Sequence, residues 1–222
     1  ISYGVLGRFN FNPVHALRAS IYHGNISATD KNNSVYKNRN LSFYSPITEF
    51  SLVYEFNFQP FGTEPLSKRA SFYIFSGIGA YHFNPKTRYN GTEFKLQPLG
   101  TEGQNLPGGK RYSRVLPSIP FGVGHKFLIN PNFTLGFEFA YRLSFTDYLD
   151  DVSGLYPDFG TQNAASGNMS AILSDRSSEI GAEYNASPRQ MRGNPSIKDH
   201  YIFAGITLTY RFTPVICFGK RY

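Results

Sequence analysis

The sequence is poor in cysteine and tryptophan and contains no long apolar run. Its 222 residues include one cysteine, Cys217, and no tryptophan. A single cysteine excludes an intrachain disulfide framework and metal sites of the Cys-x-x-Cys kind. No segment approaches the roughly 18 consecutive apolar residues that predict a transmembrane helix. Non-covalent contacts must therefore hold the fold together, and any membrane-spanning segment would have to be a β-strand.

The chain is instead rich in aromatic residues and moderately basic. It contains 21 phenylalanines and 16 tyrosines, and its formal net charge is +7. A hydrophobic fraction of 41% at this net charge is too high for a disordered polymer. The length fits one domain or two small ones. A folded chain is therefore expected.

Large apolar side chains alternate with small or polar ones in several long segments. The clearest is 133–145, where odd-numbered positions carry Phe, Leu or Tyr and even-numbered positions carry Thr, Gly, Glu, Ala, Arg or Ser. Successive side chains of a β-strand point to opposite faces, so this pattern indicates a strand with one apolar face. The same reasoning predicts seven strands, at 1–11, 15–27, 48–58, 72–83, 115–129, 133–145 and 201–212. Only 72–83 is ambiguous in facing, because both of its faces carry aromatic residues.

The predicted strands have the length and facing of membrane-spanning strands. Strands of soluble proteins cluster near 5 to 6 residues, whereas strands that cross a membrane need about 9 to 11. A soluble lipocalin-like barrel or β-sandwich is the alternative, but it would crowd the apolar side chains into a small interior. We therefore predict an all-β fold, an antiparallel up-and-down transmembrane β-barrel with aromatic side chains facing lipid.

Short and long connections alternate along the chain, as they do in such barrels. Short links are predicted at 12–13, 62–69 and 130–132, and long ones at 28–47, 84–112 and 148–199. This order places three long extracellular loops on one side and short periplasmic turns on the other. Because these barrels have an even number of strands, we expect about 8, with the first strand preceding Ile1. Residues 1–212 would form the barrel and 213–222 a periplasmic C-terminal tail.

Charged residues on the small-residue face are predicted to line the barrel interior. Burial of an unpaired charge is costly, so these groups should pair with one another. We predict a salt-bridged network that closes the lumen, with an open ion channel as the alternative. The predicted network consists of Arg8, Arg18, Glu49, Glu55, Lys126, Glu138, Arg142 and Arg211.

Aspartates gather where two predicted strands meet the third long loop. They are Asp147, Asp150, Asp151 and Asp199, with His200 beside them. Such a group could activate water or hold a divalent ion, although aspartate is also common in turns. Because no nucleophile or fixed spacing accompanies it, we predict no enzyme activity, cofactor, metal site or small-molecule substrate.

The long loops differ in charge. The third loop is acidic, whereas the first two carry most of the basic loop residues. The loops could fold over one another, or the basic ones could contact anionic lipid headgroups. Nucleic-acid binding is not expected, because it needs accessible stacking aromatics and these are committed to lipid.

Several longer strings resemble one known family. They are QPLGTEGQ (97–104), SIPFGVGHK (118–126), FTDYLDDVSGLY (145–156), LSDRS (173–177) and RGNPSIKDHYIFAGITLTYRF (192–212). These strings are similar to the PorG-like family, whose members are outer-membrane β-barrel components of the type IX secretion system of Bacteroidetes. The resemblance covers loops as well as strands. It contains no active-site motif.

The resemblance implies a non-enzymatic docking role in protein transport and gliding motility. In the outer membrane, the barrel would contact lipids and anchor a periplasmic ring of a PorK-like lipoprotein and its PorN-like partner. A small surface-binding barrel or narrow porin remains the alternative. The partner contact is expected on the tail, which combines apolar and basic side chains: Val215, Ile216, Cys217, Phe218, Lys220 and Arg221. Cys217 is either a small buried apolar group or half of an intermolecular disulfide.

Overall fold

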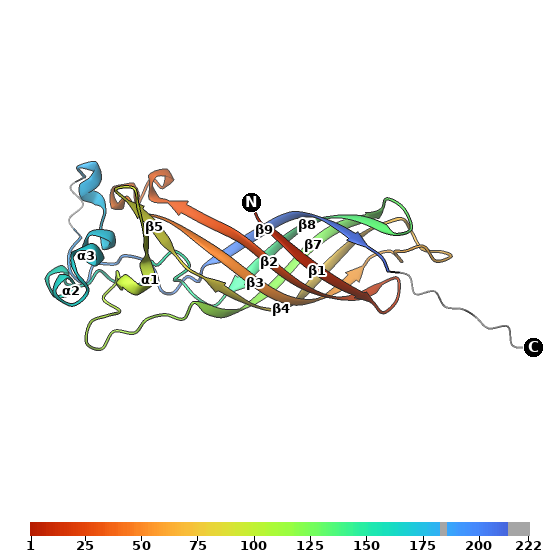
Figure 1. Cartoon of the computed structure of the whole chain (residues 1–222), viewed down its shortest axis with the longest axis horizontal. Coiled ribbons are helices and arrows are strands. Elements are labelled where there is room, and N and C mark those ends of the chain that lie inside the picture. Colours follow the sequence, from red (N-terminus) through yellow and green to blue (C-terminus); the bar gives the residue numbers. More distant parts are fainter. Residues whose placement is uncertain (183–185, 213–222) are drawn as a thin grey trace, which may run out of the picture.

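The computed structural model describes residues 1–182 and 186–212. Seven long strands curl around a common axis, with the longer loops gathered at one end and the short turns at the other (Figure 1). The long strands are β1 (Tyr3–Asn10), β2 (His15–Thr29), β3 (Ser42–Asn57), β4 (Ala70–Phe83), β7 (Val115–Leu128), β8 (Phe133–Ser144) and β9 (His200–Tyr210). Each of the seven predicted segments overlaps one of them, so the all-β prediction is confirmed.

The loops contain the remaining secondary structure, which the sequence did not predict. A small hairpin, β5 (Lys86–Tyr89) and β6 (Thr92–Lys95), and helix α1 (Leu96–Leu99) lie in the second long loop. Helices α2 (Phe159–Ser166) and α3 (Asn168–Ser174) lie in the third. Three short 3-10 turns span Asp30–Asn32, Lys37–Arg39 and Ser177–Ile180. No helix among the described residues is long and apolar enough to cross a membrane.

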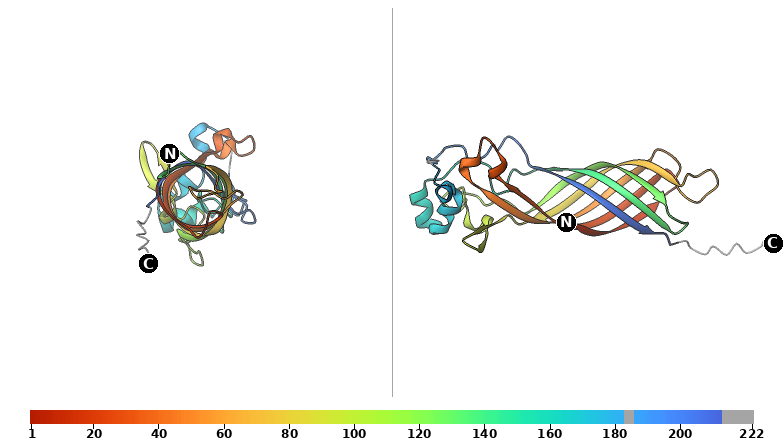
Figure 2. Two further views of the ribbon diagram at one scale, coloured as in Figure 1. Left: turned by 90° about the vertical axis from the view of Figure 1, so that its right-hand side faces the viewer. Right: turned by 90° about the horizontal axis from the view of Figure 1, so that it is seen from above.

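Neighbouring long strands pair in chain order, and every pairing is antiparallel. The order is β1-β2-β3-β4-β7-β8-β9, and β5 joins β3 at the loop end. Viewed along its axis, the sheet has a rounded outline (Figure 2). In the described part of the chain, β1 pairs only with β2 and β9 only with β8. The sheet is therefore a curled, incomplete barrel of seven strands, and the predicted eighth strand is not among the described residues.

Two of the short turns are stabilised by the same pattern of hydrogen bonds from the backbone to an asparagine side chain. The side-chain oxygen of Asn12 accepts hydrogen bonds from the backbone N–H groups of Val14 and His15, both at 2.9 Å. The side-chain oxygen of Asn130 likewise accepts hydrogen bonds from the backbone N–H groups of Asn132 and Phe133, both at 2.9 Å. Asparagine followed by proline favours such turns, because the side chain mimics a backbone acceptor while proline fixes its own φ. The Asn-Pro pairs therefore reverse the chain within a few residues.

The facing predicted from alternation agrees with the burial of the strands. On β8, Glu138, Ala140 and Arg142 are buried, whereas Phe137 and Phe139 are exposed on the outer side. The ambiguous strand β4 is also resolved, since Tyr73, Phe75, Tyr81 and Phe83 face inward while Phe72, Ile74 and Ile78 face outward. A soluble barrel with its apolar face inside would require the opposite arrangement.

Candidate functional site

The interior of the curled sheet is organised around one carboxylate, Glu55 on β3. It is fully buried, and three cations from other strands contact it. Arg8 Nε on β1 lies 3.0 Å from one oxygen, Lys126 Nζ on β7 lies 3.1 Å from the same oxygen, and Arg18 Nη1 on β2 lies 3.2 Å from the other. Arg18 also pairs with Glu138 on β8. Five of the seven strands thus meet in one ion-pair network.

A second ion pair fills the interior nearer the long loops. Arg142 Nε on β8 donates to Glu49 Oε1 on β3 at 2.8 Å. Two hydroxyl groups donate to Glu49 Oε2. The Tyr201 hydroxyl on β9 lies at 2.6 Å and the Ser118 hydroxyl on β7 lies at 3.4 Å. Glu49 and Arg142 are 3% exposed each. Their charges are therefore satisfied by side chains rather than by water.

Small inward residues make room for these contacts. Gly124 on β7 lies beside Tyr73 on β4, and a Cβ at position 124 would lie 2.3 Å from the Tyr73 ring. The ring instead occupies that space, and its hydroxyl donates to Glu138 at 2.6 Å. It also lies under Lys126, whose Nζ is 4.5 Å from the ring centroid. The absence of a side chain at Gly124 therefore lets one aromatic residue support both an acid and a cation.

Seven of the eight predicted interior charges lie in these two groups, and the inclusion of Arg211 was wrong. Strand β9 ends at Tyr210, so Arg211 lies just beyond the sheet. Its Nη1 donates to the Thr63 hydroxyl at 2.8 Å, in the short link at the turn end. The alternation that placed Arg211 inside continues one residue past the end of the strand.

The predicted aspartate group does not converge on one point. Asp147 pairs with Lys198 at 3.4 Å, and Asp199 accepts from the Leu149 N–H at 2.9 Å. Asp151 accepts from the Tyr112 hydroxyl at 2.6 Å. Among the residues that the structure describes, no group of three or more His, Cys, Asp or Glu side chains could hold a metal ion. Asp147, Asp151 and Asp199 thus each accept from a different donor and order the loop.

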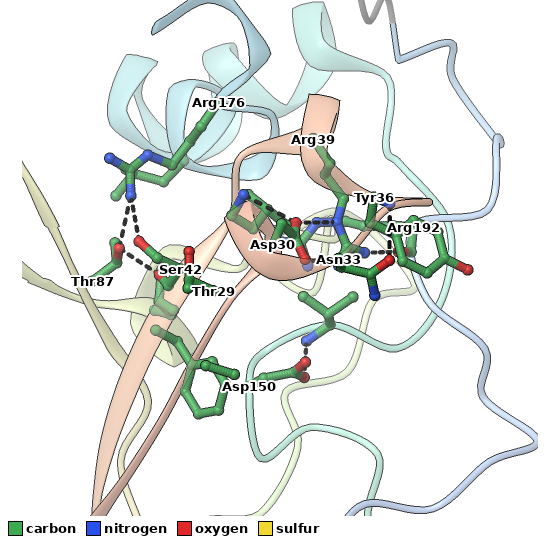
Figure 3. A pocket seen from close by; sticks show the side chains of 16 residues that line it. Thr29, Asp30, Asn33, Tyr36, Arg39, Ser42, Thr87, Asp150, Arg176 and Arg192 are labelled. Carbon is green, nitrogen blue, oxygen red and sulfur yellow. Dashed lines mark hydrogen bonds and ion pairs between the residues drawn. The ribbon is translucent and has the colours of Figure 1, made fainter. Parts of the chain in front are cut away.

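A cavity of about 290 Å³ lies among the three long loops (Figure 3). Its charged lining residues are Asp30, Arg39, Asp150, Arg176 and Arg192. Arg39 forms a two-bond pair with Asp30, at 2.7 and 2.8 Å, and also donates to the backbone carbonyl of Arg192. Arg176 donates to Thr87 at 3.0 Å and Arg192 to Glu102 at 3.0 Å. These arginines join the loops to one another.

The loops do fold over one another, but not by the predicted charge pattern. Arg176 and Arg192 belong to the third loop, which the sequence marks as acidic, and Arg192 contacts Glu102 of a loop marked as basic. Sequence reasoning missed Arg176, Arg192 and Glu102 as cross-links, because the strings that contain them show no periodicity that would indicate which residues contact each other. The predicted tail contacts, Val215, Ile216, Cys217, Phe218, Lys220 and Arg221, lie outside the described residues.

The pKa values of two loop aspartates are raised well above the usual value for this residue. Burial raises the pKa of Asp150 to about 7, and the neighbouring Asp199 carboxylate acts in the same direction. Burial also raises the pKa of Asp151 to about 6. Asp150 accepts a hydrogen bond from the Val152 N–H at 2.9 Å. Near neutral pH, the Asp150 carboxyl therefore changes charge beside the arginines of the cavity.

The fold and interior define a class of protein, an antiparallel all-β incomplete barrel with a charge-filled interior. Residues 1–171 match a family described as a domain of unknown function (DUF6089). The chain belongs to that family, because the match covers more than half of its length. Comparison with curated proteins finds no match, and comparison with solved structures finds none either.

The first prediction concerns Glu55. Glu55→Gln would leave Arg8, Arg18 and Lys126 facing a neutral amide, so we expect a loss of about 3–5 kcal/mol in the free energy of unfolding. Urea unfolding of the detergent-solubilised chain would measure it. Glu93→Gln, in the exposed loop pair with Lys86, is the matched control and should leave the midpoint unchanged. Equal midpoints for the wild type and Glu55→Gln would contradict the central role of Glu55.

The second prediction concerns pH and the loops. The folded chain holds a proton on Asp150 more strongly than the unfolded chain, since its pKa rises from 3.8 to about 7. Loop stability should therefore fall as pH rises from about 4 to about 7. Limited proteolysis should cut the loops faster at pH 8 than at pH 5.5, after correction for protease activity. Asp150→Asn should reduce this pH dependence, while the control Glu64→Gln, at the turn end, should retain it.

Proposed function

We propose that this chain is a non-enzymatic β-barrel of the bacterial outer membrane that serves assembly rather than conduction or catalysis. Within the type IX secretion system, it would anchor the periplasmic lipoprotein ring to the membrane. The observation that carries the proposal is a charge-paired interior enclosed by an apolar outer surface. That combination suits a closed membrane anchor.

The outer surface supports the membrane location. Many large apolar side chains remain exposed along the outer face of the strands. They include Phe50, Tyr54, Phe72, Ile78, Val123, Phe137, Phe139, Ile206 and Leu208. Monomeric soluble proteins rarely expose contiguous apolar patches of more than a few hundred Å². Lipid chains would cover such a surface without cost.

The interior supports a role other than conduction. Arg18, Glu55, Lys126 and Glu138 are at most 5% exposed and occupy the middle of the barrel. An ion passing along the axis would have to separate buried pairs from their partners, which is costly. The interior therefore favours a structural role of the barrel over the conduction of ions through it. The link to secretion depends on the family resemblance of the sequence strings.

A surface-binding barrel is a second candidate, favoured by the loop cavity. Its volume of about 290 Å³ could hold a small polar ligand. However, Arg39 and Arg176 already donate to acceptors within the chain, as Figure 3 shows. A ligand would have to compete with those hydrogen bonds. Ligand binding to the purified barrel would distinguish this candidate from the assembly role.

The third prediction tests membrane exposure. Phe137→Arg on the outer face of β8 should weaken folding into vesicles by about 2–4 kcal/mol if the side chain lies near the midplane of the bilayer. The heat-resistant gel-mobility shift of folded barrels would report insertion. Val35→Arg is the control, because Val35 is also an exposed apolar residue but lies in the first long loop. Equal insertion of both variants would remove the support for a lipid-facing β8.

The fourth prediction tests the assembly role. Deletion of 215–222 should leave the barrel inserted but reduce co-purification of the ring lipoprotein after gentle crosslinking in native membranes. The tail follows β9 at the short-turn end, and its apolar and basic residues suit docking. Lys68→Ala tests the other turn-end surface, the link 62–69. Undiminished capture by both variants would contradict a contact at this end of the barrel.

A further inference from the structure

One carboxylate in the lining of the loop cavity has no ion-pair partner among the described residues. It is Asp150, in the third long loop. Each of the three lining arginines is already paired with another carboxylate: Arg39 with Asp30, Arg176 with Glu179 and Arg192 with Glu102. The cavity therefore contains an acid without a matching cation.

The hydrogen bonds of Asp150 also leave one of its oxygens without a donor. Its Oδ1 accepts from the Val152 N–H at 2.9 Å (Figure 3), and no other described residue donates to the carboxylate. An ionised carboxylate has about four lone-pair sites on its two oxygens. Asp150 can therefore accept further hydrogen bonds from a donor that enters the cavity.

The charges around Asp150 favour a cation at this place. The titratable and charged groups that face it are Asp199, Arg39, Arg192 and Tyr112. The two arginines have carboxylate partners of their own, whereas Asp199 forms no ion pair with the described residues. Burial and the Asp199 carboxylate raise the pKa of Asp150 to about 7. A cation bound beside Asp150 would offset both effects and favour the ionised carboxylate.

The size and the lining of the cavity indicate an organic cation. Its volume of about 290 Å³ lies near the lower end of the range of roughly 300 to 1,000 Å³ for small-molecule sites. Among the described residues, no group of three acids, histidines or cysteines could hold a metal ion. Apolar side chains form part of the lining: Leu41, Phe43, Leu96, Val152 and Leu173. An aliphatic chain could contact them while its charged end contacts Asp150.

We propose that the loop cavity binds a small aliphatic primary amine, with its ammonium group against the Asp150 carboxylate and its carbon chain against the apolar part of the lining. An ammonium group supplies one positive charge and three N–H donors. Such a ligand leaves Arg39 and Arg176 with their present acceptors, so it avoids the competition that a ligand held by these arginines would meet.

This inference deepens the second candidate function, the surface-binding barrel, by naming the class of its ligand. It rests on the loop cavity and needs no secretion partner. Capture of the ring lipoprotein is measured separately, so the amine site and the assembly role can fail independently.

The first test compares three ligands of equal chain length, n-butylamine, n-butanol and butyrate, which end in a cationic, a neutral and an anionic group. Calorimetric titration of the full chain in a non-ionic detergent should show that n-butylamine binds at least about tenfold more tightly than either of the others. Amide hydrogen exchange should show added protection at 28–43 and 150–152, which contain lining residues, when n-butylamine is bound.

Variants of the chain test the role of Asp150. Asp150→Asn keeps an oxygen for the Val152 N–H but removes the charge, so it should weaken n-butylamine binding at least about tenfold. Glu93→Gln is the matched control, because it removes the same charge from the exposed loop pair with Lys86, and it should retain the wild-type affinity. The gel-mobility shift of folded barrels would show that both variants are folded.

The pH dependence of binding provides a separate measurement. Only the ionised Asp150 carboxylate pairs with an ammonium group, and its pKa in the free chain is about 7. The affinity of the wild type for n-butylamine should therefore rise roughly tenfold or more between pH 5.5 and pH 8. An aliphatic ammonium group stays protonated up to a pH of about 10, so the change must come from the protein. Asp150→Asn should bind n-butylamine equally at the two pH values.

Four results would overturn the proposal. Equal affinities for n-butylamine and n-butanol would exclude a charged contact. Tighter binding of butyrate would show that the arginines, rather than Asp150, hold the ligand. An equal loss of affinity in Asp150→Asn and Glu93→Gln would reduce the effect to the overall charge of the loops. An affinity of the wild type that is the same at pH 5.5 and pH 8 would exclude Asp150 as the contact.

Discussion

The fold depends on the burial of one carboxylate that is shared by three cations. Glu55 on β3 contacts Arg8 on β1, Arg18 on β2 and Lys126 on β7. A charge so far from water is tolerable only with close partners, and these partners come from strands on both sides of β3. The contacts therefore fix the curvature of the sheet as well as its charge balance. Once the charged faces turn inward, the large apolar faces must turn outward.

The size of the inward residues follows from the same constraint. Long cations, acids and the aromatic rings of β4 fill the space around the axis, so some neighbouring inward positions must be small. Gly124 is the clearest case, because the Tyr73 ring occupies the space that a Cβ would fill and its hydroxyl reaches Glu138. Aromatic residues on the inner face of β4 thus contact ionic groups and also belong to two small apolar clusters, one with Val53 and Ala140 and one with Ile47 and Leu149. The mixture of glycine and charged residues on the inward faces of β7 and β8 has this physical cause.

The sequence predicts features that depend on local periodicity, and fails where distant segments meet. The seven strands, the inward facing of Glu138 and the Asn-Pro turns all follow from residues close in the chain. Arg211 was misplaced because alternation does not mark where pairing stops. The loop contacts of Arg192 with Glu102, and of Arg176 with Thr87, join residues about 90 positions apart. No period or motif encodes such pairs, so the loop cavity could not be predicted.

The interior beside the unpaired edge of β9 contains a polar group that has no acceptor among the described residues. Around Glu55, strands on both sides supply partners, and all three cations have a carboxylate within 3.2 Å. Near β9, Arg142 pairs with Glu49 but retains an unmatched donor that lines a groove beside the unpaired edge. The ion pair of Arg142 with Glu49 is complete there, and only one buried guanidinium nitrogen, Nη1, lacks an acceptor among the described residues. Pairing of the interior charges therefore does not require closure of the sheet, because the carboxylates that pair these cations lie on β3 and β8, inside the row of paired strands.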